Sequence, residues 1–461
     1  MKFAAVQPFR TQAADCGIRS CGLVGISRSA GVAADYGDCP CSRCGHVLRR
    51  QCASPMNDLP RHPVPRAAAS RWLTVNVVAQ LAFGLLAMTI CLPSMQDWPA
   101  TFGASQAAVQ LSFSGYIAAY GLLQLVYGPL SDRHGRKPVL LVGLALGVAG
   151  SLLAAFAPNL TMLTVARMIQ GAGTAAGMVI GRALVQDLFQ GPDRTRMMAF
   201  VGMTMGLCPP AATLLGGQLH VRLGWQANFL VMAALGTVLW IAAWRGLPDR
   251  APAAPSTGRA AWRALLSGYG RLAREPAFLL FVLLMAVTTA TFYTFLGGAP
   301  LVLGRYGVTP ESLGLYIMCI PLSYIVGNWC TTRLVRRWPD RTIMLLGQVA
   351  TLTGLGLLLA LAVAGINTPL SLALPLLLLG IGHGLLVPPT LAGTVGLIPA
   401  LAGSAAAVAG VTQQLVGAFG GYAVGLVPHE GAANMALLML MWTGIGLAAQ
   451  VVLFRFFLRR T

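Results

Sequence analysis

The chain has 461 residues, of which 56% are hydrophobic and only 10% are charged, and its mean hydropathy is +0.69. Because soluble domains carry about 25% charged residues, this composition excludes an ordinary soluble protein and predicts a polytopic membrane protein. The formal net charge of +19 would suggest nucleic-acid binding in a soluble protein. Here we attribute it to arginines that face an anionic membrane surface, and we expect no nucleic-acid partner.

The first 70 residues contain no continuous apolar segment, and we expect them to form a disordered tail. The stretch from Met56, MNDLPRHPVPRAAASRW, has the form of a short basic lead-in to a membrane helix. We therefore interpret residues 1–55 as an upstream extension and Met56 as the start. Cys39, Cys41, Cys44 and His46 are residue types that bind zinc, but their spacing is irregular, and we expect neither a metal nor a cofactor.

Twelve apolar segments follow, each long enough to cross about 30 Å of hydrocarbon as a helix. The sequence therefore predicts an all-α polytopic membrane protein. A polar, Arg-bearing break after the sixth segment divides it into an N-terminal six-helix half (71–245), a cytoplasmic linker (246–275) and a C-terminal six-helix half (276–461). The segments are 72–92, 108–129, 139–157, 160–186, 197–219, 224–244, 276–298, 309–331, 342–364, 369–398, 402–427 and 433–456.

The distribution of Lys and Arg tests this count independently of hydropathy. If the N-terminus is inside, eighteen of these residues fall on inside connections or the C-terminal tail, and only Arg222 and Arg305 fall outside. This asymmetry predicts that both termini lie in the cytoplasm.

The stretch GPLSDRHGRKP follows the second segment. Gly128 and Gly135 permit a sharp turn between two helices, and Asp132 can accept hydrogen bonds from Arg136 or from a neighbouring helix N-terminus. By charge alone, the stretch is equally well explained as a positive cluster that only sets the topology. The order of its residues resembles the loop signature of the major facilitator superfamily, G-x-L-x-D-R-x-G-R-K-P, and the resemblance implies a latch between the two halves on the cytoplasmic side. The matching residues are Gly128, Leu130, Asp132, Arg133, Gly135, Arg136, Lys137 and Pro138.

The fourth segment, VARMIQGAGTAAGMVIGRALVQDLF, is similar to the R-x-x-Q-G-x-G helix of twelve-helix drug:proton antiporters, matching at Arg167, Gln170, Gly171 and Gly173. The chain most resembles their bicyclomycin- and chloramphenicol-resistance branch. The resemblance implies the major facilitator fold and a multidrug exporter of the bacterial inner membrane, not an enzyme. It would move amphipathic drugs or small metabolites by proton antiport with alternating access, and we expect a monomer in the lipid bilayer.

Two departures concern the coupling mechanism. That branch usually carries an aspartate late in the first helix, where this chain has Thr89 in TICLP. The fifth segment keeps Gly216 and Gly217 of the antiporter pattern G-P-x-x-G-G but has Thr213 at the proline position, with Pro209 and Pro210 upstream. A metabolite importer or a facilitator that is not coupled to protons therefore stays open as an alternative.

All thirteen acidic residues fall in tails, loops or helix ends, so the ionisable residues inside the spans are Arg167, Arg182 and His383. We predict that Arg167 binds a substrate group or controls a nearby protonation, since arginine does not release its proton. For Arg182 we predict a structural pair with Asp187 or Asp132. His383 is either the proton carrier or a packing histidine.

Tyr116, Tyr120, Gln124 and Tyr127 share one face of the second segment. Such a stripe indicates either helix packing or contact with an aromatic substrate. We place Tyr116, Tyr120 and Gln124 in the candidate substrate and proton pathway. Its other members are Arg167, Gln170, His383 and Gln413.

Overall fold

The computed structural model describes residues 71–189, 191–247, 267–398 and 401–457, and every regular element in these ranges is helical. The predicted tail 1–70 and residues 248–266 of the predicted linker lie outside them. Within the described ranges, ten helices are long and apolar enough to span a membrane. The two remaining long helices, α7 (Gly191–Leu223) and α15 (Ala402–Ala423), bring the number to twelve.

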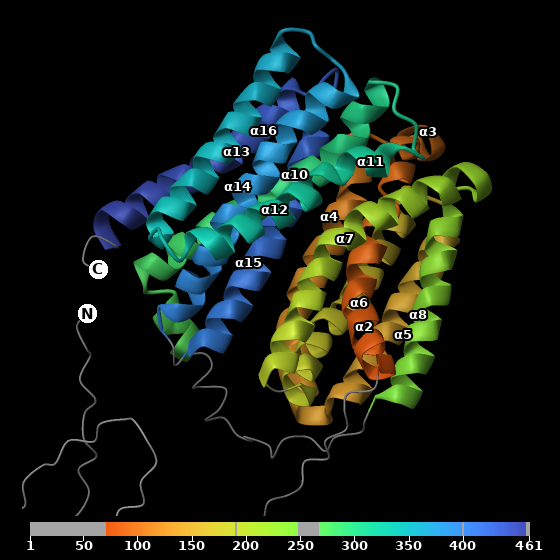
Figure 1. Cartoon of the computed structure of the whole chain (residues 1–461). Helices are drawn as coiled ribbons and strands as arrows, with labels where there is room; N and C mark the ends of the chain where they lie inside the picture. Colours follow the sequence, from red (N-terminus) through yellow and green to blue (C-terminus); the bar gives the residue numbers. More distant parts are fainter. Residues whose placement is uncertain (1–70, 190, 248–266, 399–400, 458–461) are drawn as a thin grey trace, which may run out of the picture. The chain divides into compact units, whose positions relative to one another are not determined.

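The first six long helices precede the linker, and the other six follow it (Figure 1). The first half contains α2 (Arg71–Thr89), α4 (Gln106–His134), α5 (Arg136–Ala155), α6 (Leu160–Leu188), α7 and α8 (Gln226–Gly246). The second contains α10 (Pro276–Arg305), the pair α11 (Leu313–Ile317) and α12 (Cys319–Leu334), α13 (Asp340–Val363), α14 (Pro369–Gly396), α15 and α16 (Ala433–Val452). Short turns connect or extend them: η1 (Pro93–Gln96), α3 (Trp98–Phe102), η3 (Val424–Leu426) and η4 (Leu453–Phe457).

Polar residues begin several of these helices. Ser105 accepts a hydrogen bond from the backbone N–H of Ala108 at the start of α4, and Asn159 does the same for Met162 at the start of α6. Thr368 and Ser371 form a reciprocal capping box at the start of α14. Each cap satisfies N–H groups that the helix itself leaves unpaired, which fixes where the helix begins.

Small residues bring the helices of each half close together. At Gly173 on α6, an added Cβ would overlap the backbone of Gly147 on α5. Packing of this closeness is common between membrane helices, where van der Waals contact contributes much of the association energy. The tight α5–α6 pair in turn fixes the position of the polar residues of α6.

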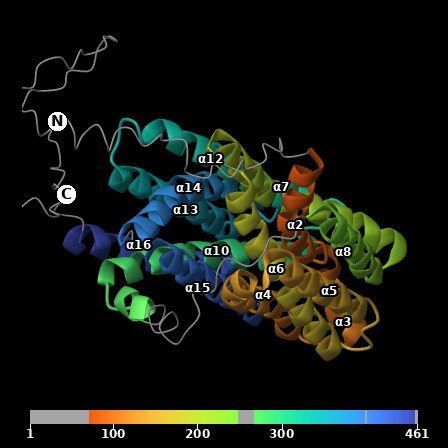
Figure 2. The ribbon, with the colours of Figure 1, turned by 90° about the horizontal axis from the view of Figure 1, so that it is seen from below.

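The two halves meet through α4 against α15 and through α7 against α11 and α12. Figure 2 shows α15 beside α4 and α12 beside α7. Side-chain amides reinforce this contact. Gln110 of α4 donates to the carbonyl oxygen of Gly297 at 2.8 Å, and Gln96 of η1 donates to that of Pro300 at 2.6 Å. Both lie toward the end of the molecule that carries α3, which we call the Asp97 face; the opposite end is the Gly135 face.

The predicted loop GPLSDRHGRKP is almost entirely helical. Helix α4 continues to His134 and α5 begins at Arg136, so Gly135 alone interrupts them, with φ of +94°. Only glycine adopts this conformation easily, so the turn requires Gly135. The prediction of a turn at Gly128 is wrong, because this residue lies inside α4 with open space around it. Basic residues in the last turn of α4 suit the negative end of the helix dipole, which helps to explain why the helix outlasts its apolar segment.

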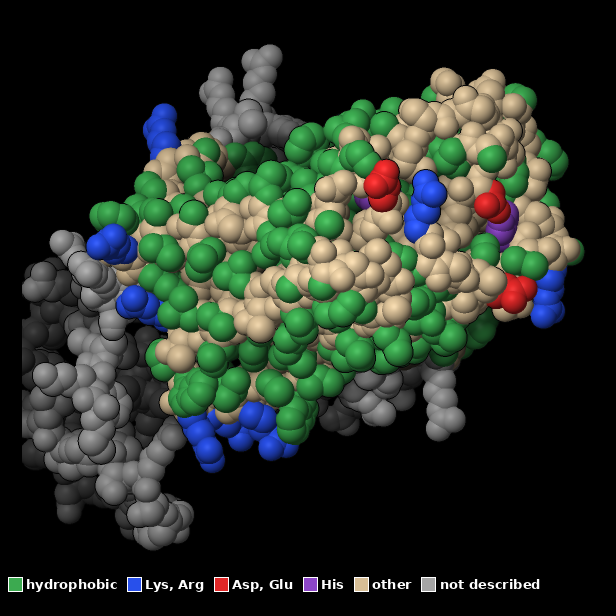
Figure 3. Space-filling view, turned by 90° about the horizontal axis from the view of Figure 1, so that it is seen from above, with side chains coloured by type: hydrophobic (Ala, Val, Ile, Leu, Met, Phe, Trp, Pro, Cys, Tyr) green, Lys and Arg blue, Asp and Glu red, His purple; other side chains and the backbone are tan. Residues whose placement is uncertain are grey.

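The described acidic side chains all lie at helix ends or in connections: Asp97, Asp132, Asp187, Glu275, Glu311, Asp340 and Glu430. Figure 3 looks onto the Asp97 face, where acidic, basic and histidine side chains are visible. In this part of the chain, no carboxylate lies at mid-span.

Candidate functional site

A buried arginine joins α6 to the end of α2. Arg167 is 0% exposed, and its Nη1 donates to the carbonyl oxygen of Ala87 at 2.7 Å and to Oε1 of Gln170 at 2.6 Å. Its Nη2 donates to the carbonyl oxygen of Met88 at 3.2 Å. The guanidinium carbon also lies 4.3 Å from the centre of the Tyr116 ring. The charge is therefore held by neutral acceptors and an aromatic face.

The end of α2 supplies the negative potential that a carboxylate would otherwise provide. Ala87 and Met88 lie in its last turn, where carbonyl groups lack partners within the helix and carry partial negative charge. Thr89 is fully buried, and its hydroxyl donates to the carbonyl oxygen of Leu85 at 2.9 Å. Arg167, which we predicted to bind substrate or control a protonation, thus lies in the core of the first half.

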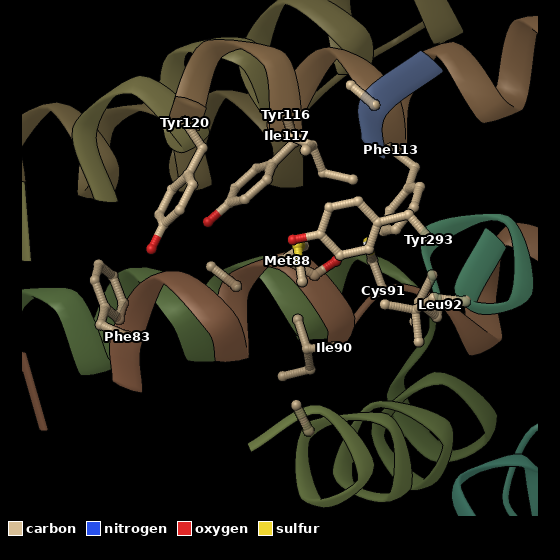
Figure 4. Packing of buried hydrophobic residues seen from close by; sticks show 14 of the residues in the cluster. Phe83, Met88, Ile90, Cys91, Leu92, Phe113, Tyr116, Ile117, Tyr120 and Tyr293 are labelled. Carbon is tan, nitrogen blue, oxygen red and sulfur yellow. Dashed lines mark hydrogen bonds between the residues drawn. The ribbon is translucent and has the colours of Figure 1, made fainter. Parts of the chain in front are cut away.

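The tyrosines of α4 pack against the same cluster. Tyr116 donates its hydroxyl to the carbonyl oxygen of Gly84 at 2.7 Å and lies 2.7 Å from Oγ1 of Thr174. Its ring stacks on Tyr120, with ring centres 6.1 Å apart (Figure 4). Tyr120 is 4% exposed, and its hydroxyl has no hydrogen-bond partner among the described residues.

The other predicted members of this region are more scattered. Gln170 donates to Oγ of Ser151 at 2.8 Å and thereby ties α6 to α5. Gln124 and Gln413 are half-buried. Tyr293 of α10 donates to Oε1 of Gln414 at 3.2 Å, and its ring contacts Phe113 of α4 edge-on. This aromatic contact lies where the two halves meet.

At the Gly135 face, Arg136 is the centre of a charge network. Its Nη1 lies 2.6 Å from Oδ1 of Asp132 and donates to Oγ of Ser131 at 2.7 Å, while its Nε donates to Oδ2 of Asp187 at 3.2 Å. The network links the ends of α4 and α6 to the start of α5. Asp187 contacts Arg136. The pair of Arg182 with Asp187 or Asp132 stays a prediction; Arg182 and Arg133 are exposed, and Lys137 is half-buried.

The antiporter-like pattern of the fifth span lies on α7. Pro209 and Pro210 are inside this helix, and the hydroxyl of Thr213 donates to the carbonyl oxygen of Pro209 at 2.7 Å. A Cβ at Gly216 would overlap the carbonyl of Ile90 in the first half, and one at Gly217 would overlap that of Pro310 in the second. These glycines therefore let α7 pack closely against the end of α2 in its own half and against the segment before α11 in the second half.

Two histidines near the Asp97 face lie close to oxygen atoms of other residues. His220 of α7 lies 2.7 Å from Oδ2 of Asp97. His429 lies 2.6 Å from the carbonyl oxygen of Val424. Burial lowers the pKa of His429, and the charge of Arg305 lowers it further, against the opposing effect of the Val424 hydrogen bond.

His383 lies in the second half, 6% exposed, at a small cavity among α10, α13, α14 and α16. Of the residues that line this cavity, the sequence pattern indicated His383 but not Gln348, Thr351 and Thr443. All three are polar residues near the middle of apolar spans, and that signal alone would have identified them.

The fold and these polar clusters define a helical membrane transporter built from two six-helix halves. The model of the Major Facilitator Superfamily matches residues 75–421, and the chain belongs to this family. It is a transporter and not an enzyme.

Two curated relatives are informative. The chain is 29% identical over 371 residues to "Multidrug resistance protein D" of Escherichia coli (strain K12), covering 80% of this chain and 92% of the relative. It is 27% identical over 369 residues to "Chloramphenicol resistance protein" of Pseudomonas aeruginosa, covering 78% and 86%. These relatives agree with the predicted resemblance to the drug:proton antiporter branch.

A solved structure agrees on the fold. The crystal structure of a D-xylose-proton symporter superposes with a TM-score of 0.65 at 14% identity, over 83% of this chain and 97% of that one. The prediction of a twelve-helix major facilitator fold in two halves is thereby confirmed.

The buried arginine generates a stability prediction. Arg167→Met should lower the free energy of unfolding by about 1–3 kcal/mol for each acceptor left unsatisfied, whereas Arg245→Met, at an exposed position of α8, should change it little. Thermal unfolding in detergent, followed by circular dichroism, measures both. Equal stability of the wild type and Arg167→Met would show that the bonds to α2 contribute nothing.

Proposed function

We propose that the chain exports amphipathic drugs or small metabolites across the bacterial inner membrane by proton antiport, with both termini in the cytoplasm. The family match over residues 75–421, with relatives named for multidrug and chloramphenicol resistance, is the observation that carries this proposal. The excess of Lys and Arg on alternate connections supports the orientation.

Transport would proceed by rocking of the two halves about the contacts between them. Gln96 and Gln110 join the halves toward the Asp97 face, which is the periplasmic side in the proposed orientation. Arg136 ties α4, α5 and α6 together at the Gly135 face, so these three helices would move as one body. In this proposal Gly128, Asp132, Arg133, Gly135, Arg136 and Lys137 form the cytoplasmic latch.

The substrate would meet aromatic and amide groups between the halves. Tyr120 has an unpaired hydroxyl, and Tyr293 and Gln413 come from the second half. When the halves separate, these groups would offer stacking surfaces and hydrogen bonds to an amphipathic molecule. Arg167 would act indirectly, as a fixed positive charge beside Tyr116.

A facilitator or importer without proton coupling is the second candidate. It is favoured by Thr89, whose hydroxyl is bonded to its own helix, and by the lack of a mid-span carboxylate in the described ranges. Such a protein would equilibrate its substrate without moving protons.

Inverted membrane vesicles containing the full chain and energised with a pH gradient separate these two functions. Chloramphenicol-like, bicyclic and cationic compounds are added in turn. Each compound that is a substrate should collapse the pH gradient. The same compound should leave the gradient unchanged in vesicles without the protein. Uptake of a compound with no change in the gradient would contradict proton antiport and support the facilitator.

The proposed latch predicts a kinetic defect. Asp132→Asn removes the 2.6 Å pair with Arg136, and because Asp132 is 62% exposed, the stability cost should stay below about 1 kcal/mol. Turnover should fall several-fold while the substrate Kd changes less than about twofold. Glu430→Gln, which neutralises an exposed acid at the other face, is the matched control. A loss of binding with normal turnover would contradict a gating role for Asp132.

A further inference from the structure

The cavity beside His383 is enclosed by four helices of the second half. Val287, Thr288 and Thr291 come from α10, Gln348 and Thr351 from α13, Leu386 from α14, and Thr443 and Gly446 from α16. The space that they leave open is about 10 Å³, which is room for about one water molecule. His383 is the only ionisable residue among those that line it.

The hydroxyl groups of this cavity are arranged as acceptors. Each of the four threonines uses its proton in a bond to the carbonyl four residues earlier in its own helix, at 2.7 Å for Thr288 and 2.9 Å for the other three. Their oxygen lone pairs are therefore left to accept from other groups. Gln348 donates its amide to the carbonyl oxygen of Thr443 at 2.8 Å, so its Oε1 is also an acceptor.

His383 itself has no hydrogen-bond partner among the described residues, although it is more than nine-tenths buried. A protonated imidazole has two N–H donors, whereas a neutral one has a single donor and a single acceptor. Donors on the ring would match the acceptors of the cavity, directly or through one bridging water. The threonine and Gln348 oxygens are thus the groups in the cavity that can accept a hydrogen bond from the ring.

We propose that this cavity is the coupling-proton site, in which His383 takes up and releases the proton while the threonine and Gln348 oxygens stabilise the imidazolium. This inference rests on the proposed antiport. A ring nitrogen accepts a proton from a hydronium ion, leaving water, and returns it to water on release, so no other reactant is needed. The site uses no carboxylate.

Other titratable groups on the elements packed around His383 do not supply a counter-charge at mid-span. The charged ones, Glu275, Arg305, Arg333, Asp340, Arg341 and Arg455, lie at or just beyond helix ends. The remaining ones are tyrosines and cysteines: Tyr293, Cys319, Tyr316, Tyr324, Cys330 and Tyr422. Stabilisation of the imidazolium therefore falls to the neutral acceptors.

Helix α10 connects this cavity to the contact between the halves. Thr288 and Thr291 line the cavity, and Tyr293 on the same helix contacts Gln414 and Phe113. A shift of α10 that accompanies substrate binding at Tyr293 would alter the acceptors around His383. Proton and substrate occupancy are then coupled through one rigid helix.

The test measures proton release from the purified full chain in weakly buffered detergent solution on addition of a substrate identified in the vesicle assay. The wild type should release close to one proton per molecule, and His383→Gln should release none. In proteoliposomes, His383→Gln should lose at least tenfold in gradient-driven accumulation but less than threefold in substrate exchange at equal pH. Thr291→Val should move the midpoint of the coupling pH profile to lower pH, because an acceptor is lost.

Thr390→Val is the matched control, since Thr390 is a buried threonine of α14 with the same bond to its own helix but lies outside the cavity. It should behave as the wild type in each measurement. If His383→Gln releases protons and accumulates substrate as the wild type does, the assignment of the proton site to His383 is wrong, although proton antiport itself is not contradicted. Transport by the wild type without proton release, or driven by Na⁺ instead, would contradict the proposed antiport itself.

Discussion

The first half depends on one interaction, the donation of hydrogen bonds from Arg167 to the last turn of α2. A full positive charge is buried there and is met by carbonyl oxygens, the Gln170 amide and the Tyr116 ring. Because each of these partners belongs to α2, α4 or α6, the arginine fixes three helices against one another. It also fixes where α2 ends, immediately before the turn that leads to η1.

A carboxylate–arginine pair would combine two tasks, which are to hold a permanent positive charge and to take up a proton. In the proposed mechanism these two tasks fall to different halves of the protein. In the first half, the charge is permanent and its partners are backbone and amide groups, which do not titrate. In the second half, His383 can titrate, and its surroundings offer only neutral acceptors. In the proposed mechanism, the first half therefore supplies a fixed framework with the latch at Arg136, and the second half carries the proton. Helix α10 is the element through which they communicate.

Much of the fold could be predicted because each span is a continuous apolar segment of the length that a bilayer requires. The end of α4 could not be predicted from the sequence, since Asp132 and Arg133 are as compatible with a loop as with a last helical turn. Arg167, Gln170 and Thr174 lie on one side of α6, but the helical period cannot show that this side packs against α2, α4 and α5. Backbone carbonyls, the main partners of Arg167, leave no signature in a sequence. The cavity around His383 combines residues from four helices, and only its individual polar members are visible beforehand.

In the proposed mechanism, proton coupling requires no membrane-embedded carboxylate. Treatment of the reconstituted protein with a hydrophobic carbodiimide tests this most directly, because the reagent modifies protonated carboxyl groups in apolar surroundings. We predict that substrate-driven proton flux persists after treatment, and that a Thr89→Asp variant, which gains such a carboxyl, becomes sensitive. Inhibition of the wild-type flux by the reagent, with protection by substrate, would contradict the account.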